Sequence, residues 1–180
     1  MRRFTAAALV SIMVAVVGAS GARAEESFTS PFGGRGGQQF MSRCPAGVEL
    51  SGVSALTGAY VNGIAAICDG RQAAGFGGSG DRRSAECPKG SVVSAIFMVS
   101  LRSDNHLLKK VTIDCVSQNG RAPTGQVDLD TSGNYTARYT PYFYRSSGYP
   151  TTTQSCGAQR IFGLQGRAGA AIDALGLICG

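Results

Sequence analysis

Three segments of this chain, each ending in a cysteine, repeat one another. Aligning Cys68, Cys115 and Cys179 brings GAYVNGIAAIC, NHLLKKVTIDC and GAAIDALGLIC into register. A period of this length is typical of a fold built from repeated supersecondary units. Before each cysteine, apolar residues alternate onto the face that carries the cysteine, as expected of a half-buried β-strand. These alternating pairs are Ile64 and Ala66, Val111 and Ile113, and Leu175 and Leu177.

The other three cysteines open the copies. Glycine clusters at 33–37 and 75–80 precede Cys44-Pro45-Ala46-Gly47 and Cys87-Pro88-Lys89-Gly90, and Cys156-Gly157 is a degenerate third opening. Each copy therefore consists of a glycine loop, a cysteine, a strand, a turn, a strand and a cysteine. Glycines, prolines and period-2 runs favour strands over helices throughout. We predict an all-β domain of three antiparallel sheets around a pseudo-threefold axis, each too small to fold alone.

The six cysteines are expected to form disulfides rather than a metal site. The count is even, no C-x-x-C pair exists, and His106 is the single histidine, so neither zinc nor another cofactor is expected. Six cysteines allow fifteen pairings. The repeat favours one disulfide per copy, with loops of similar length. The pairs would be Cys44 with Cys68, Cys87 with Cys115, and Cys156 with Cys179.

The N-terminus has the pattern of a cleavable signal peptide at residues 1–24. Arg2 and Arg3 precede an apolar run from Ala6 to Val17, and small residues end in Ala22-Arg23-Ala24. We expect a protein that begins near Glu25, is secreted to an extracellular or periplasmic space, and has no membrane span. An oxidising compartment agrees with the disulfide interpretation.

Removal of that segment leaves 156 residues, which suits one domain spanning 25–180. It also takes away Arg2, Arg3 and Arg23, so the basic residues fall from 17 to 14 against 11 acidic ones. Because the remaining cations are scattered rather than clustered, we expect no nucleic-acid partner.

Two motifs resemble known families. The stretch 166–176, GRAGAAIDALG, is similar to the end of jacalin-related lectins, whose sugar loop carries G-x-x-x-D, and GGRGGQQF at 33–40 resembles their N-terminal glycine loop. The C-P-x-G elements, with Asn62-Gly63-Ile64 before Cys68, resemble the vitelline membrane outer layer protein family, a disulfide-bonded three-repeat β-prism. The resemblance implies a β-prism in which the two lectin-like loops lie side by side and form a carbohydrate site.

In that site, the resemblance makes Asp173 the acceptor for two adjacent sugar hydroxyls. Backbone N–H groups of Ala170 and Ala171 would donate to the sugar oxygens, and glycines would let the backbone approach the ligand. The glycines of this prediction are Gly33, Gly34, Gly36, Gly37 and Gly169. The alternative is that Asp173 caps the turn before the last strand and that the glycines only form tight turns.

The same position in the first copy is Asn62, with Gly58 before it, and in the second copy it is Lys109. A neutral amide can bind hydroxyls, whereas an ammonium group cannot accept a hydrogen bond. A second carbohydrate site, if present, is therefore predicted at Gly58 and Asn62.

The stretch from Val116 to Ser155 is longer than the link between the first two copies and holds five of the six tyrosines. It is interpreted as an insertion that forms either a recognition platform or a covering hairpin. His106 lacks a partner nucleophile and is expected in a turn, and no motif supports a pair of catalytic carboxylates. The sequence therefore predicts a non-enzymatic carbohydrate-binding protein with glycans or cell-surface polysaccharide as partners. The alternative is a structural protein of the cell envelope or extracellular matrix, and an enzyme acting on glycans ranks third.

Overall fold

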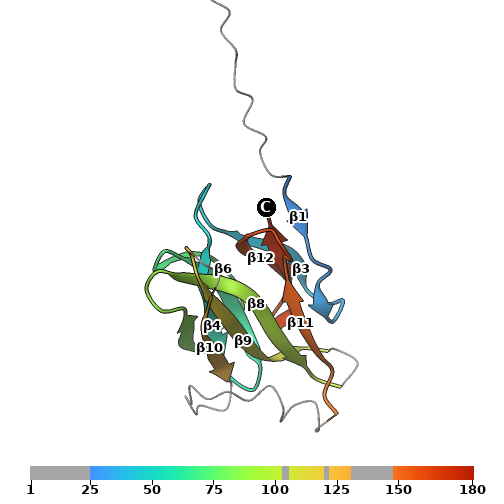
Figure 1. The fold of residues 1–180 in the computed structure, drawn as a ribbon. Helices are drawn as coiled ribbons and strands as arrows, with labels where there is room; N and C mark the ends of the chain where they lie inside the picture. The colour runs from blue at the N-terminus through green and yellow to red at the C-terminus, as the bar shows by residue number, and fades with distance from the viewer. Residues whose placement is uncertain (1–24, 103–105, 120–121, 131–147) are drawn as a thin grey trace, which may run out of the picture.

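The computed structural model describes residues 25–102, 106–119, 122–130 and 148–180, and every regular element in these ranges is a β-strand (Figure 1). The predicted signal peptide lies outside them. Within them, no helix is long and apolar enough to cross a membrane. The strands are β1 Ser27–Phe28, β2 Phe32–Gly33, β3 Gln38–Arg43, β4 Leu50–Thr57, β5 Val61–Cys68, β6 Arg71–Gly77, β7 Asp81–Glu86, β8 Ser91–Ser100, β9 Leu108–Ser117, β10 Pro123–Asp130, β11 Thr151–Ser155, β12 Ile161–Ala168 and β13 Ile172–Cys179.

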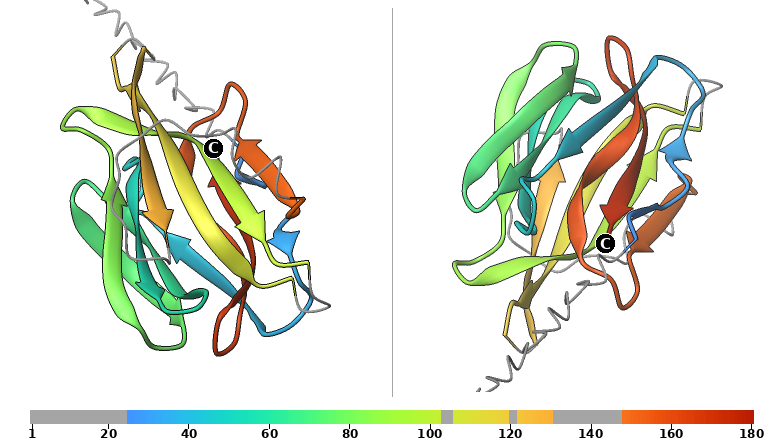
Figure 2. Two further views of the ribbon diagram at one scale, coloured as in Figure 1. Left: turned by 90° about the horizontal axis from the view of Figure 1, so that it is seen from below. Right: turned by 90° about the horizontal axis from the view of Figure 1, so that it is seen from above.

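The strands form three antiparallel sheets, as predicted (Figure 2). The first sheet has the order β7-β4-β5-β6 and the second β11-β8-β9-β10, so each is a Greek key around a central hairpin. The third sheet has the order β3-β12-β13, with β1 and β2 both paired to β13. It repeats the same pattern, but its outer strands come from the N-terminal end of the chain. The fold therefore closes by bringing the two ends of the domain together.

The core lies between the three sheets. The residues predicted to share a face with each cysteine are buried there, including Ile64, Ile113 and Leu175. In β8 a register shift between Val93 and Ala95 lets Val93, Ile96 and Met98 all join the core. Period-2 alternation thus directs one face of each sheet inward, as the sequence indicates.

The three predicted disulfides are all present, which confirms the pairing within each copy. They join Cys44 to Cys68, Cys87 to Cys115 and Cys156 to Cys179. Each also joins two sheets, because the first cysteine of a copy follows the last strand of the preceding sheet. The disulfides connect β3 to β5, β7 to β9, and β11 to β13, so they link the sheets in a closed ring.

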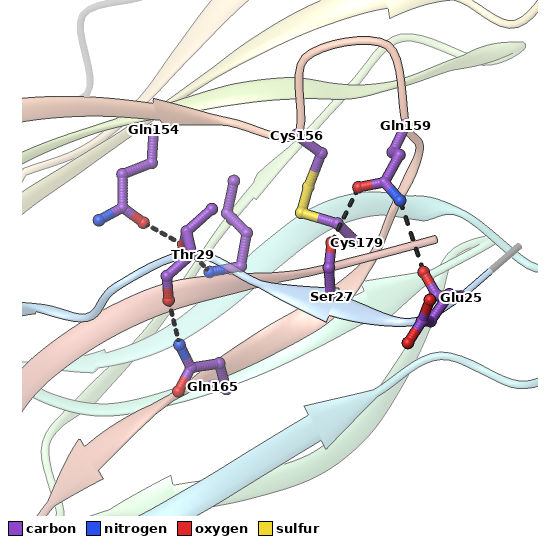
Figure 3. Close-up of a disulfide and its surroundings, with 9 residues drawn as sticks. Glu25, Ser27, Thr29, Gln154, Cys156, Gln159, Gln165 and Cys179 are labelled. Carbon is purple, nitrogen blue, oxygen red and sulfur yellow. Dashed lines mark hydrogen bonds between the residues drawn. A yellow bond between two sulfur atoms is a disulfide. The ribbon is translucent and has the colours of Figure 1, made fainter.

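The N-terminal segment is bound along β13 of the third sheet, near the Cys156–Cys179 disulfide (Figure 3). The hydroxyl of Thr29 donates to Oε1 of Gln154 at 2.6 Å, and the carbonyl of Thr29 accepts from Nε2 of Gln165 at 2.7 Å. The backbone N–H of Leu177 in turn donates to the Thr29 hydroxyl at 2.7 Å. Residue 29 therefore connects β11 of the second sheet with β12 and β13 of the third.

The stretch from Val116 to Ser155 contains β10 and β11, which are strands of the second sheet. Leu129 of β10 is buried in the core, and Asp128 forms an ion pair with the buried Lys110 at 2.9 Å. The part that exceeds the repeat therefore lies between the two strands. Most of that part, including Tyr135, Tyr139, Tyr142 and Tyr144, falls outside the described residues.

Candidate functional site

The glycine loop at residues 33–37 and the turn between β12 and β13 lie against each other. The backbone N–H of Gly34 donates to the carbonyl of Asp173 at 2.6 Å. A Cβ atom added to Gly169 would lie 3.6 Å from Cα of Gly37. Pairing of β2 with β13 and of β3 with β12 holds both ends of the loop in place. The two lectin-like motifs, which are far apart in sequence, thus form one surface.

The carboxylate of Asp173 lies under this loop. A Cβ atom on Gly36 would collide with Oδ1 of Asp173, so this position has no room for a side chain unless the carboxylate moves. Asp173 is only partly buried. Within the described ranges no donor bonds to either carboxylate oxygen, and no cation pairs with it. A capping role would require a hydrogen bond from a backbone N–H to that carboxylate, and the described residues supply none.

The turn itself offers backbone donors. The N–H of Gly169 donates to the carbonyl of Ala171 at 2.9 Å, which closes the turn. The N–H groups of Ala170 and Ala171, the predicted donors, have no acceptor among the described residues. Ala170 is exposed, whereas the side chain of Ala171 is mostly buried. The unused backbone donors of the turn therefore lie close in sequence to the acceptor oxygens of Asp173, the second residue of β13.

Arg167, near the end of β12, is a site residue that the sequence did not indicate. Its Nε donates to the carbonyl of Gly36 and its Nη2 to the carbonyl of Gly37, both at 2.7 Å. A guanidinium group presents such parallel donors in a fixed geometry, so it can hold two successive carbonyls at once. The repeat could have revealed it, because the first copy has an apolar residue, Leu56, at the equivalent position. An arginine there departs from the repeat.

The first copy forms an equivalent loop around Asn62. The N–H of Gly78 donates to the Asn62 carbonyl at 2.8 Å, and the N–H of Gly58 donates to the Tyr60 carbonyl at 3.0 Å. These two bonds match those at Asp173 and Gly169. The side chain differs, because Nδ2 of Asn62 donates to the carbonyl of Ser79 at 2.7 Å. The side-chain acceptor that Asn62 offers a ligand is its neutral Oδ1, in place of the two carboxylate oxygens of Asp173.

These two loops touch. A Cβ atom added to Gly78 would collide with the carbonyl oxygen of Ala170. The Asp173 and Asn62 positions therefore belong to one continuous end of the molecule, opposite the end at which the disulfides lie.

The second copy has no acceptor at the equivalent position. The Nζ of Lys109 lies 5.3 Å from the ring centroid of Tyr149, and the Arg102 guanidinium lies 6.0 Å from the same ring. His106 adopts a φ of 44° in the turn between β8 and β9, as the sequence predicts for a turn residue. Among the described residues, no group of three or more His, Cys, Asp or Glu side chains could hold a metal ion.

Hollows at the disulfide end are of a different kind. One of about 790 Å³ is lined by Glu49, Asp69, Glu86 and Lys89, among other residues of the turns. Glu49 in it is already paired with Arg160 at 2.6 Å. Asp173 instead combines a carboxylate that has no donor in the described ranges with the unused backbone N–H groups of Ala170 and Ala171, so it is the better candidate for ligand recognition.

Comparison with solved structures agrees with this architecture. Malaysian banana lectin superposes with a TM-score of 0.58 at 17% identity, over 87% of this chain and 99% of the lectin. Artocarpin in complex with mannopentose gives a TM-score of 0.59 at 12% identity, over 88% of this chain and 99% of artocarpin. The fold is a jacalin-like β-prism. The β-prism also superposes with a lamprey immune protein, with a TM-score of 0.58 at 17% identity, and there this chain spans only 44% of the longer protein.

Sequence comparison adds nothing to the structural match. No family model matches this β-prism, and no curated protein matches its sequence. The low identities mean that the lectin likeness concerns the fold, so function must be argued from the site.

Proposed function

We propose that this chain is a secreted, non-catalytic lectin that binds a hexose of the mannose type at Asp173. The observation that carries the proposal is the partly buried Asp173 carboxylate, which has no protein donor among the described residues. Artocarpin, which shares the fold, has been crystallised with methyl α-mannose and with mannose oligosaccharides. The glycans would be free oligosaccharides or cell-surface polysaccharide.

The chemistry of the site suits a pair of neighbouring hydroxyls. The two oxygens of a carboxylate can each accept one hydroxyl proton, and hydrogen bonds to an ionised acceptor are stronger than neutral ones. The N–H groups of Ala170 and Ala171 would then donate to oxygens of the same ring. The small side chains of these two alanines offer little surface for stacking on the sugar, so hydrogen bonding would dominate the affinity.

The second predicted site, at Gly58 and Asn62, is proposed as the weaker one. One N–H of its amide donates to the Ser79 carbonyl, and its acceptor is a neutral amide oxygen rather than a carboxylate. We therefore expect one strong site per chain.

A structural protein of the cell envelope or extracellular matrix is the second candidate. The ring of disulfides across all three sheets favours it, because such crosslinks suit a protein that must persist outside the cell.

A glycan array probed with the disulfide-bonded protein from Glu25 onward separates the two candidates. The lectin proposal predicts binding to mannose-containing glycans that free methyl α-mannoside displaces. Silence on the array, combined with tight association with cell-envelope material, would favour the structural candidate. Release of shortened saccharides during the incubation would contradict the non-catalytic part of the proposal.

A further inference from the structure

We infer that Arg167 is a positioning residue that holds the glycine loop over Asp173 and thereby leaves the Asp173 carboxylate available to a ligand. The inference rests on the proposed function for the ligand, but its structural part concerns the loop alone.

The contact geometry supports a clamp. Nε and Nη2 of one guanidinium donate to the successive carbonyls of Gly36 and Gly37, each at 2.7 Å. Because a trans peptide is planar, a Gly36 carbonyl that points at Arg167 sends the N–H of Gly37 in the opposite direction. That N–H has no acceptor among the described residues, so the clamp also presents a donor beside Asp173.

The first copy shows how an equivalent loop is held without an arginine. Strand register places Leu56 where Arg167 stands, opposite Gly63 and Arg82, just as Arg167 is opposite Ala174 and Gln39. A leucine side chain cannot donate to a carbonyl. There the task falls to Asn62, whose amide nitrogen donates to the Ser79 carbonyl at 2.7 Å.

The two copies differ in which residue holds the loop. In the first copy, the residue at the acceptor position also holds its own loop. In the third copy the clamp comes from Arg167, so Asp173 makes no bond to the loop through its carboxylate. Because Arg167 holds the loop, the Asp173 carboxylate of the third copy can accept hydrogen bonds from two neighbouring sugar hydroxyls.

The test uses three variants of the disulfide-bonded protein. Arg167→Leu introduces the residue of the first copy, and Arg167→Lys keeps the charge but lacks the rigid pair of parallel donors that a guanidinium presents. Arg160→Leu is the matched control, because Arg160 precedes the same strand at its other end and pairs with Glu49. For each variant, we would measure methyl α-mannoside affinity by calorimetry, amide hydrogen exchange of residues 33–37, and the melting temperature.

The clamp predicts at least a tenfold loss of mannoside affinity in Arg167→Leu, with faster exchange in residues 33–37 and a melting temperature close to that of the wild type. Arg167→Lys should fall between the wild type and Arg167→Leu in both affinity and exchange, and Arg160→Leu should match the wild type. If Arg167→Leu fails to fold, the Lys variant decides by the same two measurements.

Wild-type affinity and wild-type exchange in the Arg167 variants would overturn the inference. If the wild-type protein binds no mannoside, the proposed function fails, and exchange alone decides the clamp. Unchanged exchange in Arg167→Leu would then refute the clamp, whereas faster exchange confined to 33–37 would support it.

Discussion

An aspartate at position 173 could either cap a turn or bind a ligand, and its hydrogen bonds distinguish the two roles. Its backbone carbonyl accepts from Gly34, which is structural, while its carboxylate has no donor in the described part of the chain. The two functions thus reside in different atoms of the same residue. Because no protein donor in the described ranges engages this partly exposed carboxylate, both of its oxygens are free to accept hydrogen bonds from a ligand.

The space over this carboxylate can be tested at Gly36. We predict that Gly36→Ala lowers mannoside affinity at least tenfold, because the added Cβ would displace Oδ1 of Asp173. The free energy of unfolding should change by less than about 1 kcal/mol, since residue 36 is exposed. Gly75→Ala is the control, because its Cβ would meet no atom closer than 3.7 Å. Equal affinities of the two variants, measured by titration calorimetry, would contradict this arrangement.

At the residue scale, the sequence indicates the acceptor but not its support. Asp173 stands out because a motif and the repeat both place it in a turn before a strand. Arg167 does not, because its role depends on two carbonyls that lie some 130 positions away in the chain. Local patterns carry no information about a contact made through backbone atoms of a distant loop.

The N-terminal segment 25–33 acts as a structural element, although it holds only two short strands. β1 and β2 both pair with β13 and complete the third Greek key. Thr29 lies between the two strands, and its bonds reach the second sheet through Gln154 and the third through Gln165. Since β2 leads directly into the glycine loop, this segment also anchors one end of the candidate site.

Removing the Thr29 hydroxyl tests that connection. We predict that Thr29→Ala lowers the free energy of unfolding by about 1–3 kcal/mol, because the change leaves the N–H of Leu177 without its acceptor. Chemical denaturation would measure the loss. Thr153→Ala, at an exposed position of β11, should stay within about 0.5 kcal/mol of the wild type. A Thr29 variant as stable as that control would show that the segment contributes little.

At the scale of the whole molecule, the disulfides hold together three sheets that are each too small to be stabilised by a hydrophobic core of their own. Each one crosslinks two sheets, and together they connect all three. Three four- or five-stranded sheets share one core, so none has an independent core to rely on.

Deleting one crosslink should therefore loosen the whole prism. For Cys156→Ala with Cys179→Ala, we predict a loss of about 3 kcal/mol in the free energy of unfolding, the entropy expected for a loop closed over a separation of 23 residues. The Cys44 and Cys68 pair, with a separation of 24, should behave alike. The pairs can be verified by mass mapping of the unreduced protein. Unfolding free energies within about 1 kcal/mol of the wild type in both double variants would contradict the crosslinking role.

Much of the fold is predictable because short segments of the sequence determine it. The hairpins and the disulfide pairs follow from alternation and from the repeat, and both are confirmed. What the sequence does not indicate is that Cys44 directly follows a strand of the third sheet while Cys68 ends a strand of the first, or that β1 completes the third sheet. These assignments to sheets depend on how the copies pack and on how the two ends of the domain come together. A repeat in the sequence predicts neither.

The proposed lectin function depends most directly on the Asp173 carboxylate, and one titration tests it. Asp173→Asn keeps the size of the side chain and removes its charge. It breaks no hydrogen bond within the described residues, because none of them donates to the Asp173 carboxylate. We predict that methyl α-mannoside binds the wild-type protein with a stoichiometry of one, and that the variant binds more weakly by about 1–3 kcal/mol with an unchanged melting temperature. Unchanged affinity, or a lower melting temperature with no effect on binding, would contradict the account.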